Sequence, residues 1–184
     1  MMYCLHKRYL AKAALPIVLT SYFLILTSVS KAATTTLNAV INPGSLTVTN
    51  SSVASISAVT LEGVSQSSAG SLGPIIVTDN RGTGAGWSVT MTVSDFSCCT
   101  PIRTITSTNL TVAPGSLSVV SGKTAGVSAG ETHTVSSATD PVTLMTAIAD
   151  SGLGSYRVTP TINLSIPGDA YAGTYTATVT VTII

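Results

Sequence analysis

The chain has few charged residues, few aromatic residues and almost no histidine. Of its 184 residues, 8% are Asp, Glu, Lys or Arg and 5% are Phe, Trp or Tyr, and the chain has one tryptophan and two histidines. Binding to nucleic acid or to an anionic membrane needs a clustered basic patch, and scattered cations cannot form one. General acid-base catalysis also has few candidate groups. The sequence therefore predicts neither a nucleic-acid-binding protein nor an enzyme.

Cysteine is scarce and poorly placed for a structural framework. Cys4 lies near the N-terminus, and Cys98 and Cys99 are adjacent. Neighbouring cysteines close a ring too small to gain loop entropy, so they do not join distant segments. They are free thiols, a vicinal disulfide in a loop before Pro101, or a bridge to another molecule. A zinc site needs four ligands and only His133 is added downstream, so we expect no metal and no cofactor.

The N-terminal region has the three zones of a secretory signal peptide. A stretch with three cations and no acid precedes the apolar run 13–26, which is shorter than the ~20 residues of a membrane-spanning helix. Ser30 and Ala32 then provide small residues where a signal peptidase requires them, which predicts cleavage between Ala32 and Ala33. An N-terminal anchor that is not cleaved is the alternative.

Cleavage would make residues 1–32 a signal peptide and residues 33–184 an exported protein of single-domain size. The exported part has four cations and seven carboxylates, which gives a net charge of −3. Its many Thr, Val and Ser residues favour pleated strands over disorder, because disordered chains lack β-branched residues. We expect an extracellular protein at the cell surface, with no membrane contact after cleavage.

Alternation of apolar and polar residues predicts a chain made mostly of strands. The predicted strands are 34–41, 45–49, 53–63, 74–78, 87–96, 105–112, 116–120, 156–167 and 174–184, whereas 123–139 is predicted as loop and 142–150 as a strand or a short helix. With turn signals at short spacing and no long amphipathic helix, the pattern predicts an all-β fold. We expect a single antiparallel β-sandwich of immunoglobulin-like or Greek-key type with about eight strands.

The loop 79–86, DNRGTGAG, is predicted to join two paired strands. Asp79 is expected either to pair with Arg81 or to accept backbone N–H bonds within the loop. Its glycines do not form a phosphate-binding loop, because no Lys and no helix follow them. The glycines are better explained by the backbone geometry of the turn.

Four side chains are candidates for contact with a ligand: Trp87, Tyr171, Asp79 and Arg81. Trp87 shares one face of its strand with Val89, Met91 and Val93, which favours a place in the core over a sugar-stacking platform. Tyr171 lies in the predicted turn GDAYAG and is the tyrosine that we expect to be most exposed.

Ser128 lies in a G-x-S-x-G pattern, the spacing of a hydrolase nucleophile, with His133 and Asp140 downstream. In that fold the serine stands between a strand and a helix, and the acid precedes the histidine. Here polar loop sequence follows the serine and the acid comes last. We therefore interpret this pattern as a chance match in a chain rich in Ser and Gly.

Two segments carry a resemblance to a known family. IVTDNRGTGAGWSVTMTVSDF and LSIPGDAYAGTYTATVTVTII resemble the WxL-domain family of bacterial cell-surface proteins, near its first tryptophan motif and its closing strand. The first motif here is Trp87-Ser88-Val89, and Val179-Thr180-Val181 stands in the region of the second, without a tryptophan. The resemblance implies non-covalent attachment to peptidoglycan.

These features predict a secreted cell-surface protein that associates non-covalently with the cell wall. Its expected partners are cell-wall glycan or other surface proteins. The alternative is a structural subunit of a surface fibre, pilus or surface layer, in which 174–184 or 34–41 adds a strand to a neighbour's sheet and makes a homo-oligomer. The closing strand is also similar to that of spore-coat-U-type pilins.

Overall fold

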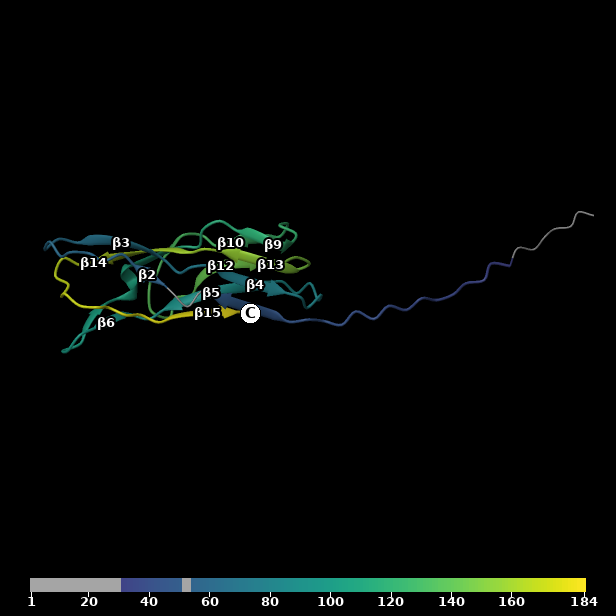
Figure 1. The fold of residues 1–184 in the computed structure, drawn as a ribbon, viewed down its shortest axis with the longest axis horizontal. Helices are drawn as coiled ribbons and strands as arrows, with labels where there is room; N and C mark the ends of the chain where they lie inside the picture. The colour runs from purple at the N-terminus through teal and green to yellow at the C-terminus, as the bar shows by residue number, and fades with distance from the viewer. Residues whose placement is uncertain (1–30, 51–53) are drawn as a thin grey trace, which may run out of the picture. The chain divides into compact units, whose positions relative to one another are not determined.

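The computed structural model describes residues 31–50 and 54–184, and from residue 40 onward they form an all-β domain (Figure 1). The predicted signal peptide, apart from Lys31 and Ala32, lies outside the described residues. Fifteen short strands and one turn of 3-10 helix, Ser107–Asn109, follow one another along the described chain. The predicted all-β fold is confirmed.

The strands pair in four antiparallel sheets, which we name A to D. Sheet A has the order β1 (Leu46–Asn50), β4 (Ile75–Asp79), β13 (Gly154–Val158) and β9 (Ser118–Gly122). Sheet B has the order β11 (His133–Thr134), β8 (Leu110–Ala113), β14 (Thr161–Ile166), β3 (Gln66–Ser71) and β2 (Ser55–Ile56). Sheet C has the order β10 (Val127–Ala129), β12 (Val142–Ala147), β5 (Trp87–Val93) and β15 (Val179–Ile183), and sheet D is the hairpin β6 (Phe96–Cys98) and β7 (Arg103–Ile105).

The core is built from the inward faces of these strands. In β5 every second residue is buried, so that Trp87, Val89, Met91 and Val93 point inward as the sequence predicts. The largest fully buried side chains are Tyr156, Ile75, Met91, Leu110, Leu144 and Met145. Each such side chain contributes roughly 1.5–3 kcal/mol by leaving water, so the packed interior holds the sheets together.

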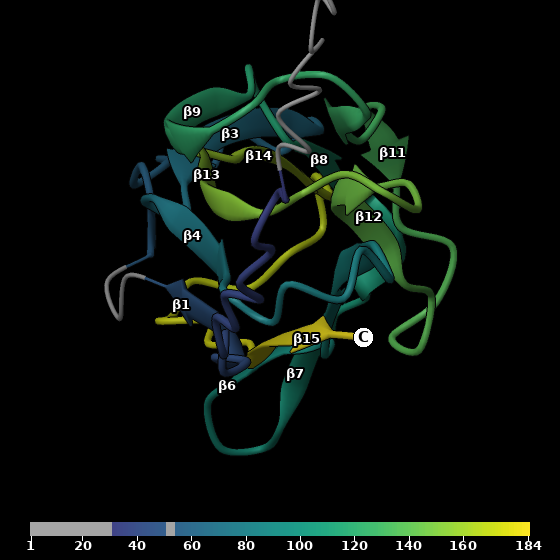
Figure 2. The ribbon, with the colours of Figure 1, turned by 90° about the vertical axis from the view of Figure 1, so that its right-hand side faces the viewer.

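The domain has two distinguishable ends. In Figure 1, β2, β3, β14 and β6 lie toward one end, whereas β4, β9 and β13 lie toward the other. Seen along the strands in Figure 2, β1, β4, β13, β12 and β15 surround the centre. The two ends carry different side-chain clusters.

The predicted strand 34–41 is wrong, because this segment lies outside every strand of the described chain and its side chains are exposed. Alternation alone predicts a strand, but a strand needs a partner for its backbone groups. The predicted loop 123–139 is also wrong in part, since it contains β10 and β11. The closing strand begins only at Val179, and before it Thr176 forms an isolated bridge to Ser97.

The loop after Asp79 does not join two paired strands, contrary to the prediction. β4 pairs with β1 and β13 in sheet A, whereas β5 pairs with β12 and β15 in sheet C. The loop is therefore a crossover between sheets. Gly86, with a φ of 72°, is required there because a Cβ atom would lie 2.5 Å from the carbonyl oxygen of Ala147.

Candidate functional site

Asp79 and Arg81 form a bidentate ion pair at one end of the domain. Arg81 donates from Nε and Nη2 to the two carboxylate oxygens over 3.0 and 2.9 Å, and its backbone N–H donates to Oδ1 over 2.9 Å. Arg81 Nη2 also donates to the carbonyl oxygen of Gly86 over 2.7 Å. Both roles predicted for Asp79, pairing with Arg81 and accepting a backbone N–H, thus occur together. Through Arg81 they connect the start of the crossover loop to Gly86 at its end.

The electrostatics of this pair follow from its contacts. The side-chain hydrogen bonds from Arg81 hold the pKa of Asp79 below its usual value, against the effect of burial, which raises it. The Asp79 side chain is only 2% exposed and that of Arg81 is 25% exposed. Because the Asp79 carboxylate is buried and accepts three hydrogen bonds within the loop, its role is to stabilise the loop.

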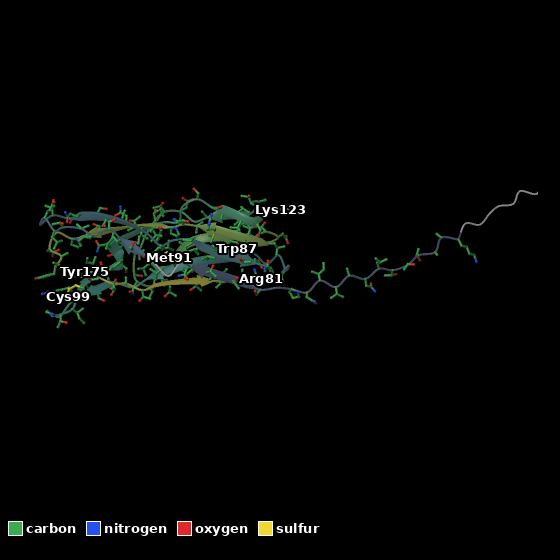
Figure 3. The ribbon with its side chains drawn as sticks, viewed as in Figure 1. Arg81, Trp87, Met91, Cys99, Lys123 and Tyr175 are labelled. Atoms are coloured by element: carbon green, nitrogen blue, oxygen red, sulfur yellow. A yellow bond between two sulfur atoms is a disulfide. The ribbon has the colours of Figure 1, made fainter. Side chains whose placement is uncertain are left out.

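Trp87 lies next to this loop and is buried at 4% exposure. Its indole Nε1–H donates to the carbonyl oxygen of Gly152 over 3.0 Å, and its ring lies 5.7 Å from that of Tyr156, tilted by 48°. Figure 3 shows Arg81 and Trp87 in one half of the domain. The core position that the sequence favours for Trp87 is confirmed.

Tyr171 lies elsewhere, with Tyr175 and Cys99 at the opposite end (Figure 3). The Tyr171 side chain is 57% exposed, and the guanidinium carbon of Arg103 stands 3.8 Å from the centre of its ring. The hydroxyl of Tyr175 donates to the carbonyl oxygen of Tyr171 over 3.1 Å. The structure therefore does not bring Tyr171 together with Trp87, Asp79 and Arg81.

The two adjacent cysteines support the turn that carries Tyr171. Cys98 and Cys99 form a vicinal disulfide, one of the alternatives that the sequence left open. Cys99 Sγ lies 3.9 Å from the carbonyl oxygen of Ala172. A Cβ atom at Gly173 would overlap Cys99 Sγ and lie 2.9 Å from Cys98 Sγ, so only glycine fits against the disulfide. The hairpin β6–β7 thus places both Arg103 and the disulfide beside the turn that carries Tyr171.

Ser128, His133 and Asp140 lie in one region but do not form a catalytic triad among the described residues. Ser128 Oγ is 3.1 Å from Thr146 Oγ1, and no hydrogen bond joins it to His133. His133 Nε2 is 2.7 Å from Asp140 Oδ2, which also accepts from the backbone and hydroxyl of Ser136. These bonds, above all the one with His133, lower the pKa of Asp140 to about 2. Ser128 and His133 line a shallow cavity of about 430 Å³.

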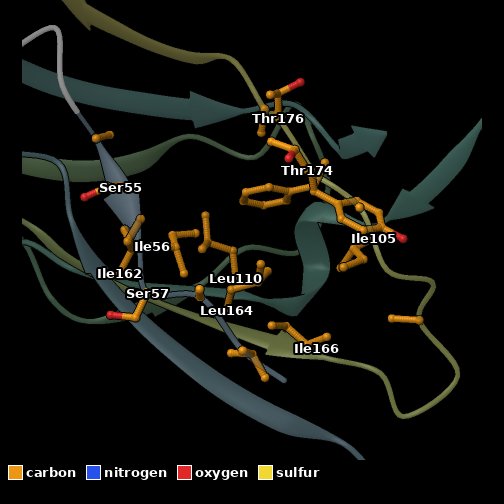
Figure 4. A pocket seen from close by; sticks show the side chains of 18 of the residues that line it. Ser55, Ile56, Ser57, Ile105, Leu110, Ile162, Leu164, Ile166, Thr174 and Thr176 are labelled. Carbon is orange, nitrogen blue, oxygen red and sulfur yellow. The ribbon is translucent and has the colours of Figure 1, made fainter. Parts of the chain in front are cut away.

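A larger cavity of about 830 Å³ opens between two stretches of chain, 54–61 and 170–177, and we call it the apolar slot. Figure 4 shows Ser55, Ile56 and Ser57 on one wall and Thr174 and Thr176 on the other. Its floor is made of core side chains: Leu72, Met91, Val93, Phe96, Ile105, Leu110, Ile162 and Leu164. Nothing in the sequence pattern indicated this cavity.

Residues 40–183 match the model of the WxL domain, described as a surface cell wall-binding domain. The chain belongs to the WxL domain family. The resemblance in the two sequence segments is thereby confirmed, and the WxL domain is a cell-wall-binding domain of the cell surface. No curated protein and no solved structure matches the chain.

The segment Trp87-Ser88-Val89, which resembles the first tryptophan motif of the family, lies in the core of this chain. Trp87 and Val89 are both buried, so the motif holds β5 in place. Arg103 is the residue that sequence reasoning missed, because its partner Tyr171 is 68 positions away in the chain. A basic residue in a hairpin is common, and no local signal marks it as the neighbour of an exposed ring.

Over residues 31–50 and 54–184, no three His, Cys, Asp or Glu side chains are grouped so that they could hold a metal ion. The same residues include no helix with the length and hydropathy needed to cross a bilayer.

Proposed function

We propose that this WxL domain is secreted after cleavage between Ala32 and Ala33 and attaches non-covalently to peptidoglycan. The observation that carries the proposal is the family match over residues 40–183. The exposed end with Tyr171 and Arg103 is our candidate for the contact. Asp79, Arg81 and Trp87, which the sequence also offered as ligand contacts, are better understood as supports of the fold because of their burial and internal bonds.

The chemistry of the Tyr171 end suits a cell-wall polymer. An exposed aromatic ring stacks on the apolar face of a sugar, and an arginine pairs with a carboxylate such as those of peptide stems. Arg103 and Tyr171 are close enough to contact one repeat of such a polymer together. The disulfide and Gly173 hold the turn in place, which lowers the entropy lost on binding.

Sedimentation with isolated peptidoglycan tests the proposal. The processed protein, made by export of the full chain, is expected to pellet with peptidoglycan, and Tyr171→Ala and Arg103→Ala are each expected to weaken binding by about tenfold. Arg157→Ala is the matched control, since Arg157 is an exposed arginine on β13. Wild-type protein that remains wholly in the supernatant would contradict peptidoglycan binding. Equal losses in all three variants would contradict the assignment of the site.

The second candidate function is a subunit of a surface assembly built by strand addition. Of the two segments that the sequence offers as donors, 174–184 contains β15, which pairs with β5 of its own chain. The segment 34–41 pairs with no strand of the described chain. This difference favours 34–41 as the segment that would join another surface protein or a second copy.

A further inference from the structure

The apolar slot is bounded by the edge strands of two different sheets. β2 is the outer strand of sheet B, and β15 is the outer strand of sheet C. One wall of the slot, 54–61, contains β2, and the other, 170–177, leads into β15. The slot therefore lies between these two edges, and Figure 4 shows the side chains that line it.

One wall of the slot has unused backbone hydrogen-bonding groups. Ser55 and Ile56 pair with β3, and the N–H of Ser57 donates to the carbonyl oxygen of Ala69, so β2 bonds on the side of sheet B. Residues 58–61 make no backbone hydrogen bond to any other described residue. An edge with unpaired N–H and C=O groups is a template for one more strand.

The slot is large, apolar and without charge. Its volume of about 830 Å³ exceeds what one or two side chains fill, and none of the described residues that line it is Asp, Glu, Lys, Arg or His. Its floor is the core itself, so a side chain that entered would contact buried Met91, Phe96 and Leu110. A strand that fits must be uncharged and must present apolar side chains at every second position.

The segment 34–41, which we call the N-terminal arm, has these properties. Its sequence TTTLNAVI contains no charge and places Leu37, Ala39 and Ile41 on one face. The side chains of Leu37 and Ile41 are 91% and 92% exposed, although their transfer out of water would be favourable. The arm and the wall 54–61 each have eight residues, and eight residues of extended chain span about 26 Å.

The arm joins its own domain at the end away from the slot. Gly44 N–H donates to the carbonyl oxygen of Asn80 over 2.9 Å, so the arm ends beside the crossover loop that leads to Trp87. Val179, which lines the slot, pairs with Val93 at the other end of β5. The point at which the arm is attached and the slot therefore lie at opposite ends of the domain.

We propose that the apolar slot binds the N-terminal arm of a second copy of this chain as an added β-strand. Leu37, Ala39 and Ile41 face the core of the receiving copy, and the backbone of the arm pairs with 58–61. Because each copy has an arm and a slot at different ends, the contact is heterologous and extends to head-to-tail chains. This inference deepens the second candidate function and does not depend on binding to peptidoglycan.

The oligomeric state of the processed protein tests the proposal. Light scattering after size-exclusion chromatography is expected to give a series of oligomers that grows with concentration. Leu37→Asp with Ile41→Asp places two carboxylates against the apolar floor and is expected to lower the association constant by at least about a hundredfold. Thr36→Asp with Asn38→Asp adds the same charge on the other face of the arm and is the matched control, with a loss of less than about tenfold.

A mixing experiment isolates one contact. The Leu37→Asp/Ile41→Asp variant keeps its slot, and an Ala58→Arg variant, changed at an exposed wall residue, keeps its arm. Each variant alone is expected to be monomeric, and the mixture is expected to give a one-to-one dimer. A synthetic peptide of residues 33–42 is expected to bind the arm variant and to compete with dimer formation. Circular dichroism and thermal unfolding of each variant establish that the fold is kept.

Three results would overturn the proposal: a wild-type monomer at all concentrations that also fails to bind the peptide, oligomers that persist in the Leu37→Asp/Ile41→Asp variant, or equal losses in this variant and its control. The peptidoglycan sedimentation described above is repeated with the arm variant. Wall binding by a protein that no longer associates with itself separates the two functions, since each can fail without the other.

Discussion

Trp87 donates its indole N–H to the carbonyl oxygen of Gly152, 65 positions away in the chain, over 3.0 Å. Gly152 has a φ of 83°, and a Cβ atom there would lie 2.5 Å from the indole nitrogen. Trp87 and this glycine thus pack closely against one another. Together they join β5 to the turn before β13, which connects sheet C with sheet A.

Trp87→Phe is expected to lower the free energy of unfolding by about 1–3 kcal/mol, because it removes a buried hydrogen bond and part of a buried ring. Urea denaturation measures the change. Ile102→Ala, at an exposed side chain, is the control and is expected to change stability by less than about 0.5 kcal/mol. Peptidoglycan binding by folded Trp87→Phe protein is expected to equal that of the wild type, and its loss would place the indole in the binding site.

Asp79→Ala is expected to lower the free energy of unfolding by about 2–4 kcal/mol, since it removes the acceptor of three hydrogen bonds and leaves Arg81 without its partner. Asp169→Ala, at an exposed aspartate with no such partner among the described residues, serves as the control. A change at Asp79 as small as that at Asp169 would mean that the ion pair does not stabilise the crossover loop.

Acid is expected to destabilise the domain through Asp140. Its pKa in the folded protein is about 2, below its ordinary value of 3.8, so the folded state favours the ionised form. The resulting stability is complete above about pH 4 and is lost as the pH falls through about 2. Denaturation between pH 6 and pH 2 measures this loss. Asp140→Asn is expected to flatten the profile in that window, and an unchanged profile would assign the acid sensitivity to other carboxylates such as Asp79.

Gly173→Ala is expected to weaken peptidoglycan binding, because the added methyl group overlaps the vicinal disulfide and displaces the turn that carries Tyr171. Sedimentation with peptidoglycan gives the binding, and thermal unfolding gives the stability, which is expected to fall by about 1–3 kcal/mol. Gly63→Ala is the control, since a Cβ atom at that exposed glycine meets no other atom within 4 Å. Gly63 has a φ of 74°, whereas Gly173 has no positive φ, so the control adds backbone strain that Gly173→Ala lacks. A loss of peptidoglycan binding in Gly173→Ala alone therefore comes from the overlap with the disulfide.

The sequence predicted the part of the fold that depends on local alternation. β5 and its inward face are as predicted, because a period of two in apolar residues specifies which side is buried. The strand proposed at 34–41 has equally clear alternation, yet it has no partner in the described chain. Alternation specifies a face, whereas pairing depends on a second segment that the pattern does not identify.

The site was less predictable than the fold. Asp79 and Arg81 are two positions apart, so their pairing could be inferred from the loop sequence. Arg103 and Tyr171 meet only because the hairpin β6–β7 and the turn before β15 come together at one end. The apolar slot is a gap between two sheet edges, and it depends on the arrangement of the sheets and not on any one motif.

The position of the sole tryptophan makes it an intrinsic optical probe of the domain. Trp87 is buried at the end that holds Arg81, and Tyr171 and the slot wall at Tyr175 lie at the other end (Figure 3). The wavelength of its fluorescence emission therefore reports unfolding of the crossover region. A ligand bound at the opposite end is too remote to quench the fluorescence of Trp87. A spectral shift on addition of a wall fragment would reveal that a distant contact is transmitted along β5.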